Sequence, residues 1–119
     1  MNMNEFMEKM RGSVESLDSR AEEFSGARLD DDIRAEVAVL FTESFQNLLT
    51  SIRTNCEFGD FSAIHKDAHQ IKGMAGTVGY PEISVVAQDL EEAAKSNNAA
   101  LCEDILELLC EWNRIKTES

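Results

Sequence analysis

Residues 68–79 read AHQIKGMAGTVG, and the fold that the sequence predicts depends on this stretch. Glycine costs about 0.8–1 kcal/mol relative to alanine inside a helix, so three glycines in one helical run need a reason other than ordinary packing. Apolar residues spaced i, i+4, i+7, i+11 and i+14 fall on one line of a helical wheel. They are Ile64, Ala68, Ile71, Ala75 and Val78. The segment therefore predicts an amphipathic helix whose buried face follows that line.

The outward side of the same helix carries the residues that suggest chemistry. His69 lies roughly 140° from the centre of the apolar line, with His65 one turn before it and Lys72, Gly73 and Gly76 after it. A neutral imidazole is a nucleophile, and a lysine one turn away suits a phosphoryl group. We expect an exposed histidine on a surface with few side chains, which a bulky partner can reach.

A known family carries the pattern His-x-hydrophobic-Lys-Gly-x-small-x-x-hydrophobic-Gly. The residues that match it are His69, Ile71, Lys72, Gly73, Ala75, Val78 and Gly79. Over about residues 31–116 the chain resembles the histidine-containing phosphotransfer (HPt) domains of multistep two-component phosphorelays. It looks most like the HPt domains that end certain hybrid sensor kinases, which also have glycine where Gly76 stands. A free-standing protein and a part of such a kinase both fit the sequence.

The resemblance implies a covalent phosphoryl carrier. His69 is expected to accept a phosphoryl group from an aspartate of one receiver domain and to pass it to an aspartate of another. Partners are then response-regulator receiver domains or a hybrid sensor kinase, and any Mg²⁺ is expected on the receiver. No Gly-rich nucleotide-binding pattern is present, so no kinase activity of its own and no cofactor are expected. The rival hypothesis is an adaptor of the same fold that binds a receiver or kinase without being phosphorylated.

Composition excludes other classes of function. The 119 residues contain 11 Lys and Arg against 23 Asp and Glu, a net charge of −12, so neither nucleic acid nor an anionic membrane is an expected partner. There is no membrane-length apolar run and no signal-peptide pattern, so we expect a cytoplasmic protein. The spacing of Cys56, Cys102 and Cys110 favours buried or half-buried thiols over disulfides or zinc. His65 and His69 have the spacing of a metal pair, but without further ligands no metal is expected.

The chain divides into an N-terminal helical extension, 1–27, and a bundle, 28–119. A 3-4 spacing of apolar residues predicts one helix from Asn4 to about Glu23. These residues are Met3, Met7, Met10, Val14, Leu17, Ala21 and Phe24. A helix packed on the bundle, a helix that docks a partner or a second copy of an otherwise monomeric protein, and a partly disordered tail are all compatible with this pattern.

Four further helices are predicted at about 31–57, 60–79, 81–95 and 99–116. Short connections between amphipathic helices make neighbours antiparallel, so the predicted fold is all-α, an up-down-up-down four-helix bundle with an additional N-terminal helix. The apolar stripes predicted to be buried include Ile33 and Leu40 in the first of these helices and Leu101 and Trp112 in the last.

The turn near residue 80 predicts the partner of the histidine. His69 lies about eleven residues before this turn, and Glu91 lies about eleven after it, so the two should be level. A carboxylate there would hold one ring nitrogen protonated and orient the ring. Gln88, one turn away, is the competing candidate.

The roles of the remaining residues are less specific. Lys72 is expected to neutralise the charge of the phosphoryl group. Gly73 and Gly76 are expected to leave clearance for the partner, although Gly73 could instead allow close helix packing. His65 is either part of the partner-binding surface or an incidental polar neighbour.

Overall fold

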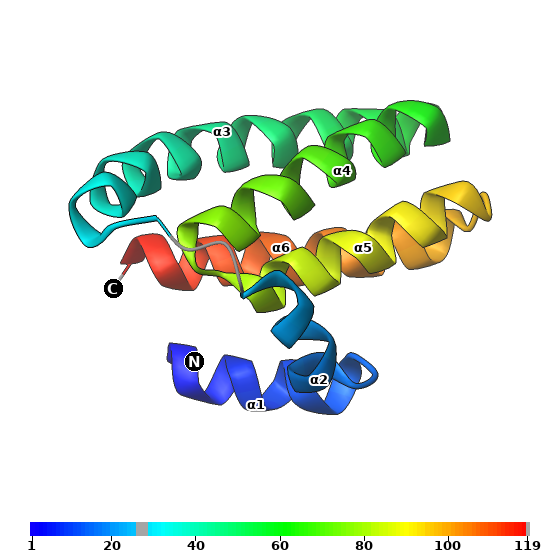
Figure 1. Ribbon diagram of the computed structural model, residues 1–119. Coiled ribbons are helices and arrows are strands. Elements are labelled where there is room, and N and C mark those ends of the chain that lie inside the picture. The colour runs from blue at the N-terminus through cyan, green and yellow to red at the C-terminus, as the bar shows by residue number, and fades with distance from the viewer. Residues whose placement is uncertain (26–28, 119) are drawn as a thin grey trace.

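Four long helices build the bundle, and a shorter helical segment precedes them (Figure 1). The computed structural model describes residues 1–25 and 29–118. The elements are α1 (Met3–Ser13), α2 (Leu17–Ala21), the 3-10 helix η1 (Glu22–Phe24), α3 (Asp31–Phe58), α4 (Phe61–Val78), α5 (Pro81–Lys95) and α6 (Ala99–Glu118). Within those described ranges there is no strand, and the all-α class is confirmed. The expected boundary between residues 27 and 28 lies outside the described residues.

Local signals in the sequence set the ends of α3, α4 and α5. Gly59 ends α3 with a left-handed backbone, φ 68°, and the Asp60 side chain then accepts a hydrogen bond from the Ala63 N–H at 3.1 Å, which caps α4. Gly79, φ 94°, ends α4, and Pro81 is the first residue of α5. These turns are short, so successive helices are antiparallel, as predicted.

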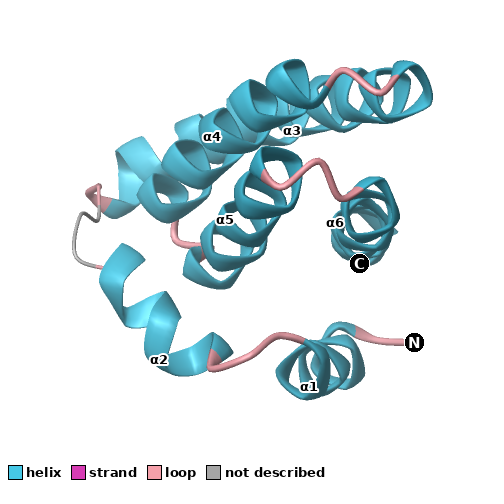
Figure 2. Ribbon diagram, turned by 90° about the vertical axis from the view of Figure 1, so that its right-hand side faces the viewer, coloured by secondary structure: helices cyan, strands magenta, loops and turns pink. Residues whose placement is uncertain are grey.

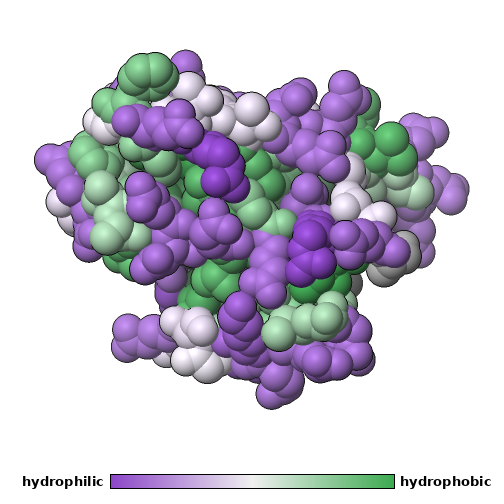
Figure 3. Space-filling view, turned by 180° about the vertical axis from the view of Figure 1, so that it is seen from behind, coloured by the Kyte–Doolittle hydropathy of each residue, from purple (hydrophilic) through white to green (hydrophobic). Residues whose placement is uncertain are grey.

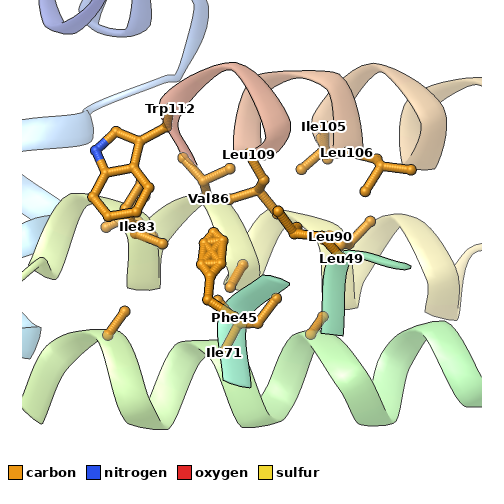
Figure 4. Close-up of a cluster of buried hydrophobic side chains, with 14 of the residues drawn as sticks. Phe45, Leu49, Ile71, Ile83, Val86, Leu90, Ile105, Leu106, Leu109 and Trp112 are labelled. Carbon is orange, nitrogen blue, oxygen red and sulfur yellow. The ribbon is translucent and has the colours of Figure 1, made fainter. Parts of the chain in front are cut away.

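The core lies between α3, α4, α5 and α6, each of which packs against its two neighbours in the ring (Figure 4). Trp112 is buried, and its ring stacks on Phe45 with 5.4 Å between centroids. Cys102 is fully buried, and burial raises the pKa of its thiol to about 11. Cys56 and Cys110 are half-buried free thiols, so the expected burial of the three cysteines is confirmed.

The N-terminal segment is packed on the bundle, but not as the single helix that was predicted. The chain breaks between α1 and α2, where Ser16 adopts a left-handed φ of 53°. This break lets the segment turn, so that α1 lies against α6 while α2 and η1 lie against α5 (Figure 2). The predicted apolar face is largely buried, together with Phe6, which the 3-4 spacing did not include.

Three apolar residues predicted to be buried are exposed instead. Ile33, Leu40 and Leu101 have exposed fractions of 49%, 63% and 43%. α3 has 28 residues and α4 only 18, so the first turns of α3 extend past the helix that follows it. Helical periodicity identifies an apolar face, but it does not show where the neighbouring helix ends. In the part of the chain that the structure describes, no helix combines the length and apolar character that crossing a membrane requires.

Gly76 is buried, and the prediction that it clears space for a partner is wrong. A Cβ at this position would lie 3.2 Å from the Phe24 carbonyl oxygen and 3.3 Å from Ser84 Oγ. Gly76 therefore lets η1 and α5 approach α4 closely. Gly73, by contrast, is exposed, and a Cβ there would meet nothing within 4 Å, so close helix packing does not explain this glycine.

The two glycines should respond in opposite ways to a large side chain. We expect Gly76→Leu to lower the free energy of unfolding by about 1–3 kcal/mol, because the side chain overpacks the contact with η1 and α5. Gly73→Leu should leave it unchanged or raise it by about 0.5–1 kcal/mol, because leucine is the better helix former. Urea unfolding followed by circular dichroism measures both. Equal stability of the two variants would contradict the packing role of Gly76.

Candidate functional site

His69 projects from α4 into solvent and is held from one side only. Its side chain is 67% exposed, and its Nδ1 lies 3.3 Å from Glu91 Oε2. A carboxylate accepts hydrogen bonds, so Nδ1 is assigned the ring proton and Nε2 keeps its lone pair. Nε2 has no hydrogen-bond or ion-pair partner among residues 1–25 and 29–118. The arrangement presents a nucleophilic nitrogen to whatever approaches α4.

Glu91 lies on α5 and is the buried centre of the site. Only 7% of the residue is exposed, yet its carboxylate meets three basic side chains from α4. Lys72 Nζ lies 2.7 Å from Oε1, and His65 Nε2 lies 3.5 Å from the same Oε2 that contacts His69. The three residues are spaced i, i+4 and i+7, which places them on one face of α4. A buried carboxylate is destabilising without a cation, so Lys72 makes this position tolerable.

The predicted level pairing of His69 and Glu91 agrees with this geometry, whereas the competing candidate Gln88 does not. Gln88 Oε1 accepts a hydrogen bond from Arg20 Nη2 at 3.2 Å, and the same guanidinium pairs with Asp89 at 2.6 Å. The hydrogen bond to Asp89 raises the pKa of Arg20 above its ordinary value. α2 therefore binds the side of α5 that carries Gln88 and Asp89. Nothing local in the sequence indicates Arg20, because its partners are almost seventy positions away.

Ser84 is a further residue that sequence reasoning missed. It is fully buried on α5, and its Oγ donates a 2.7 Å hydrogen bond to the backbone carbonyl of Lys72. This bond joins α5 to α4 one turn beyond His69. It also accounts for the buried hydroxyl, which would otherwise be destabilising.

A groove of about 510 Å³ opens beside His69, between α3 and α4. Half of its ten lining residues have apolar side chains, namely Val37, Leu40, Phe41, Met74 and Val78. Gly73 lies in it one turn after His69, where the missing side chain leaves the surface open. The surface beside the histidine is therefore apolar as well as bare. The sequence did not predict this, because Leu40 was assigned to the core.

Metal binding finds no further support in the geometry. Among the described residues, no group of three or more His, Cys, Asp or Glu side chains is arranged to hold a metal ion.

Comparison with known proteins identifies a family. The family model for the Hpt domain matches residues 36–118, which begins inside α3 and extends through α6. Neither the curated proteins nor the solved structures contain a match. The matched region holds His69, Lys72 and Glu91, whereas α1, α2 and η1 lie outside it.

The geometry predicts that Glu91 determines the tautomer of His69. With Glu91→Met we expect the ring to become a mixture of the two neutral tautomers, because Nδ1–H loses its acceptor. The ¹⁵N chemical shifts of the two ring nitrogens measure this. Glu92→Met, at the exposed neighbouring position, is the control and should keep the Nδ1–H form. A wild-type ring without a dominant Nδ1–H form would contradict the assignment.

Proposed function

Because the chain belongs to the Hpt domain family, whose members are phosphotransfer carriers in phosphorelays, we propose that it carries a phosphoryl group on His69 between the aspartates of two receiver domains. The observation that carries this proposal is an exposed imidazole whose Nδ1 contacts a buried carboxylate and whose Nε2 is open. The proposed carrier is monomeric and cytoplasmic and has no kinase activity of its own.

The transfer step uses the open nitrogen. The Nε2 lone pair of His69 attacks the phosphorus of a receiver aspartyl phosphate, and an N–P bond forms as the P–O bond to the aspartate breaks. The electron pair of that bond stays on the aspartate, which leaves as a carboxylate. The ring keeps its Nδ1 proton and gains positive charge, which Glu91 at 3.3 Å stabilises. Attack by an aspartate of the second receiver reverses these bond changes.

Lys72 is proposed to neutralise the phosphoryl group. It lies one turn after His69, and its ammonium group contacts Glu91 Oε1 at 2.7 Å with 23% of the side chain exposed. A phosphoryl group on Nε2 adds negative charge next to this pair and attracts the ammonium. Phosphoryl transfer depends mainly on positioning and charge neutralisation, which these residues supply. Mg²⁺ would come with the receiver.

The groove beside His69 is the proposed docking surface for the receivers. Its apolar lining, the exposed Leu40 and the open position at Gly73 let a bulky domain come close to Nε2. His65, on the other side of His69 and 45% exposed, would border the same contact. An adaptor that is never phosphorylated could use this surface too. It would have no need of a carboxylate buried against Nδ1, and this favours the carrier.

Phosphorylation should depend on His69. Incubation with a radiolabelled, phosphorylated receiver domain should transfer label that is stable in base and labile in acid. His69→Gln should lose this label, because the amide is no nucleophile. Lys66→Gln, at an exposed position of α4 outside the groove, should keep it. If wild type binds the receiver without acquiring label, the adaptor hypothesis replaces the carrier.

Clearance at Gly73 should control the rate of transfer. We expect Gly73→Leu to slow transfer from the receiver by about tenfold or more, because a branched side chain one turn from His69 keeps the partner away from Nε2. Rapid-quench measurement of the label on His69 gives the rate. Lys66→Leu, an exposed position on α4 outside the groove, is the control. An unchanged rate would remove the proposed role of Gly73.

A further inference from the structure

A second and larger groove lies between α1, α5 and α6, and it shares no residue with the groove beside His69. Its volume is about 640 Å³. One wall comes from Lys9 and Ser13 of α1 and from Val14 directly after it, all of which lie outside the region that matches the family. The phosphotransfer chemistry proposed above does not involve this groove.

The floor of the second groove is an apolar stripe that α1 covers only in part. Leu101, Ile105 and Leu108 follow one another along α6 and line the groove. α1 runs antiparallel to α6 and stops before the first turns of α6 (Figure 1). Leu101 is consequently 43% exposed, although it belongs to the stripe that is buried further along the helix. Figure 3 shows the molecule from behind, where apolar surface is visible between hydrophilic side chains.

The rim of this groove is strongly acidic. The lining contains five carboxylates, Asp89, Glu92, Asp104, Glu107 and Glu111, and one lysine, Lys9. Three of the acids form ion pairs: Asp89 with Arg20, Glu107 with Arg53 and Glu111 with Lys9. Glu92 on α5 and Asp104 on α6 have no ion-pair partner in the described part of the chain. Uncompensated negative charge therefore lies on both helices that border the apolar floor.

α1 itself shows what kind of segment fits this surface. It is an amphipathic helix that buries Phe6 and Met10, and its Lys9 pairs with Glu111 of α6 at 2.9 Å. α6 thus already binds one helix, α1, that has an apolar face and a basic residue on its flank. A helix placed beyond the end of α1 would meet Leu101 with its apolar side and Glu92 and Asp104 with its flanks.

We propose that the groove between α1, α5 and α6 binds an amphipathic helix of a partner protein, with Lys or Arg on both flanks of its apolar face. The charge of the rim argues against the other occupants. Nucleic acid and anionic membranes would be repelled, and so would a second copy of this chain with its net charge of −12. Such a partner can remain bound while the groove beside His69 stays open to receivers.

The test uses a synthetic 18-residue amphipathic peptide built from leucine and lysine, with binding measured by fluorescence anisotropy at about 0.15 M salt. We expect saturable binding to wild type and about tenfold weaker binding to Leu101→Asp, because a charge disrupts the apolar floor. Val39→Asp, at a 71% exposed position on α3, is the control and should bind as wild type does. Leu101→Asp adds negative charge, so binding driven by charge alone would become tighter.

A second pair of variants tests the rim. Glu92→Gln combined with Asp104→Gln should weaken binding several-fold, whereas Glu36→Gln combined with Glu43→Gln, two exposed acids on α3, should not. Three results would each overturn the proposal: no binding to wild type, unchanged or tighter binding to Leu101→Asp, or an equal loss in the α3 control variants. None of these measurements depends on phosphotransfer, so the carrier proposal and this one can fail separately.

Discussion

The site depends on one carboxylate buried between two helices. Glu91 on α5 can be buried only because α4 places positive or hydrogen-bonding groups opposite both of its oxygens, with Lys72 on Oε1 and His69 on Oε2. This contact requires α4 and α5 to be antiparallel and level, which the short turn at Gly79 provides. The same contact that satisfies the buried charge therefore orients the imidazole. Structure and chemistry at this position rest on one interaction.

The segment before the bundle contributes to this alignment through contacts with α5 within one turn of Glu91. Arg20 binds Gln88 and Asp89, and the Phe24 carbonyl lies close to Gly76 of α4. These contacts join the segment to both helices that carry the site. They also explain why Gln88 does not serve as the partner of His69, because its side chain is already hydrogen-bonded to Arg20 of α2. On α5, Gln88 and Asp89 therefore bind the N-terminal segment, whereas Glu91 contacts His69.

Two exposed apolar surfaces lie where helices of unequal length meet. The first turns of α3 extend past α4 and leave Leu40 exposed in the groove that His69 also lines, and the first turns of α6 extend past α1 and leave Leu101 in the acidic groove. Both places combine an apolar floor with a chemically distinct border, a histidine in one and carboxylates in the other. The two proposed partners would therefore bind separate faces.

The sequence by itself determined the helical class, the four helices of the bundle and the outward position of His69, because these follow from periodicity and from local signals such as Asp60, Gly79 and Pro81. It also indicated Glu91, since one short turn relates the two helices. Only the tertiary structure decided that Gly76 is a packing position and that Gln88 belongs to Arg20. It also decided that Leu40 and Leu101 are exposed. These outcomes depend on which distant segment lies opposite and where it ends, and no local pattern contains that information.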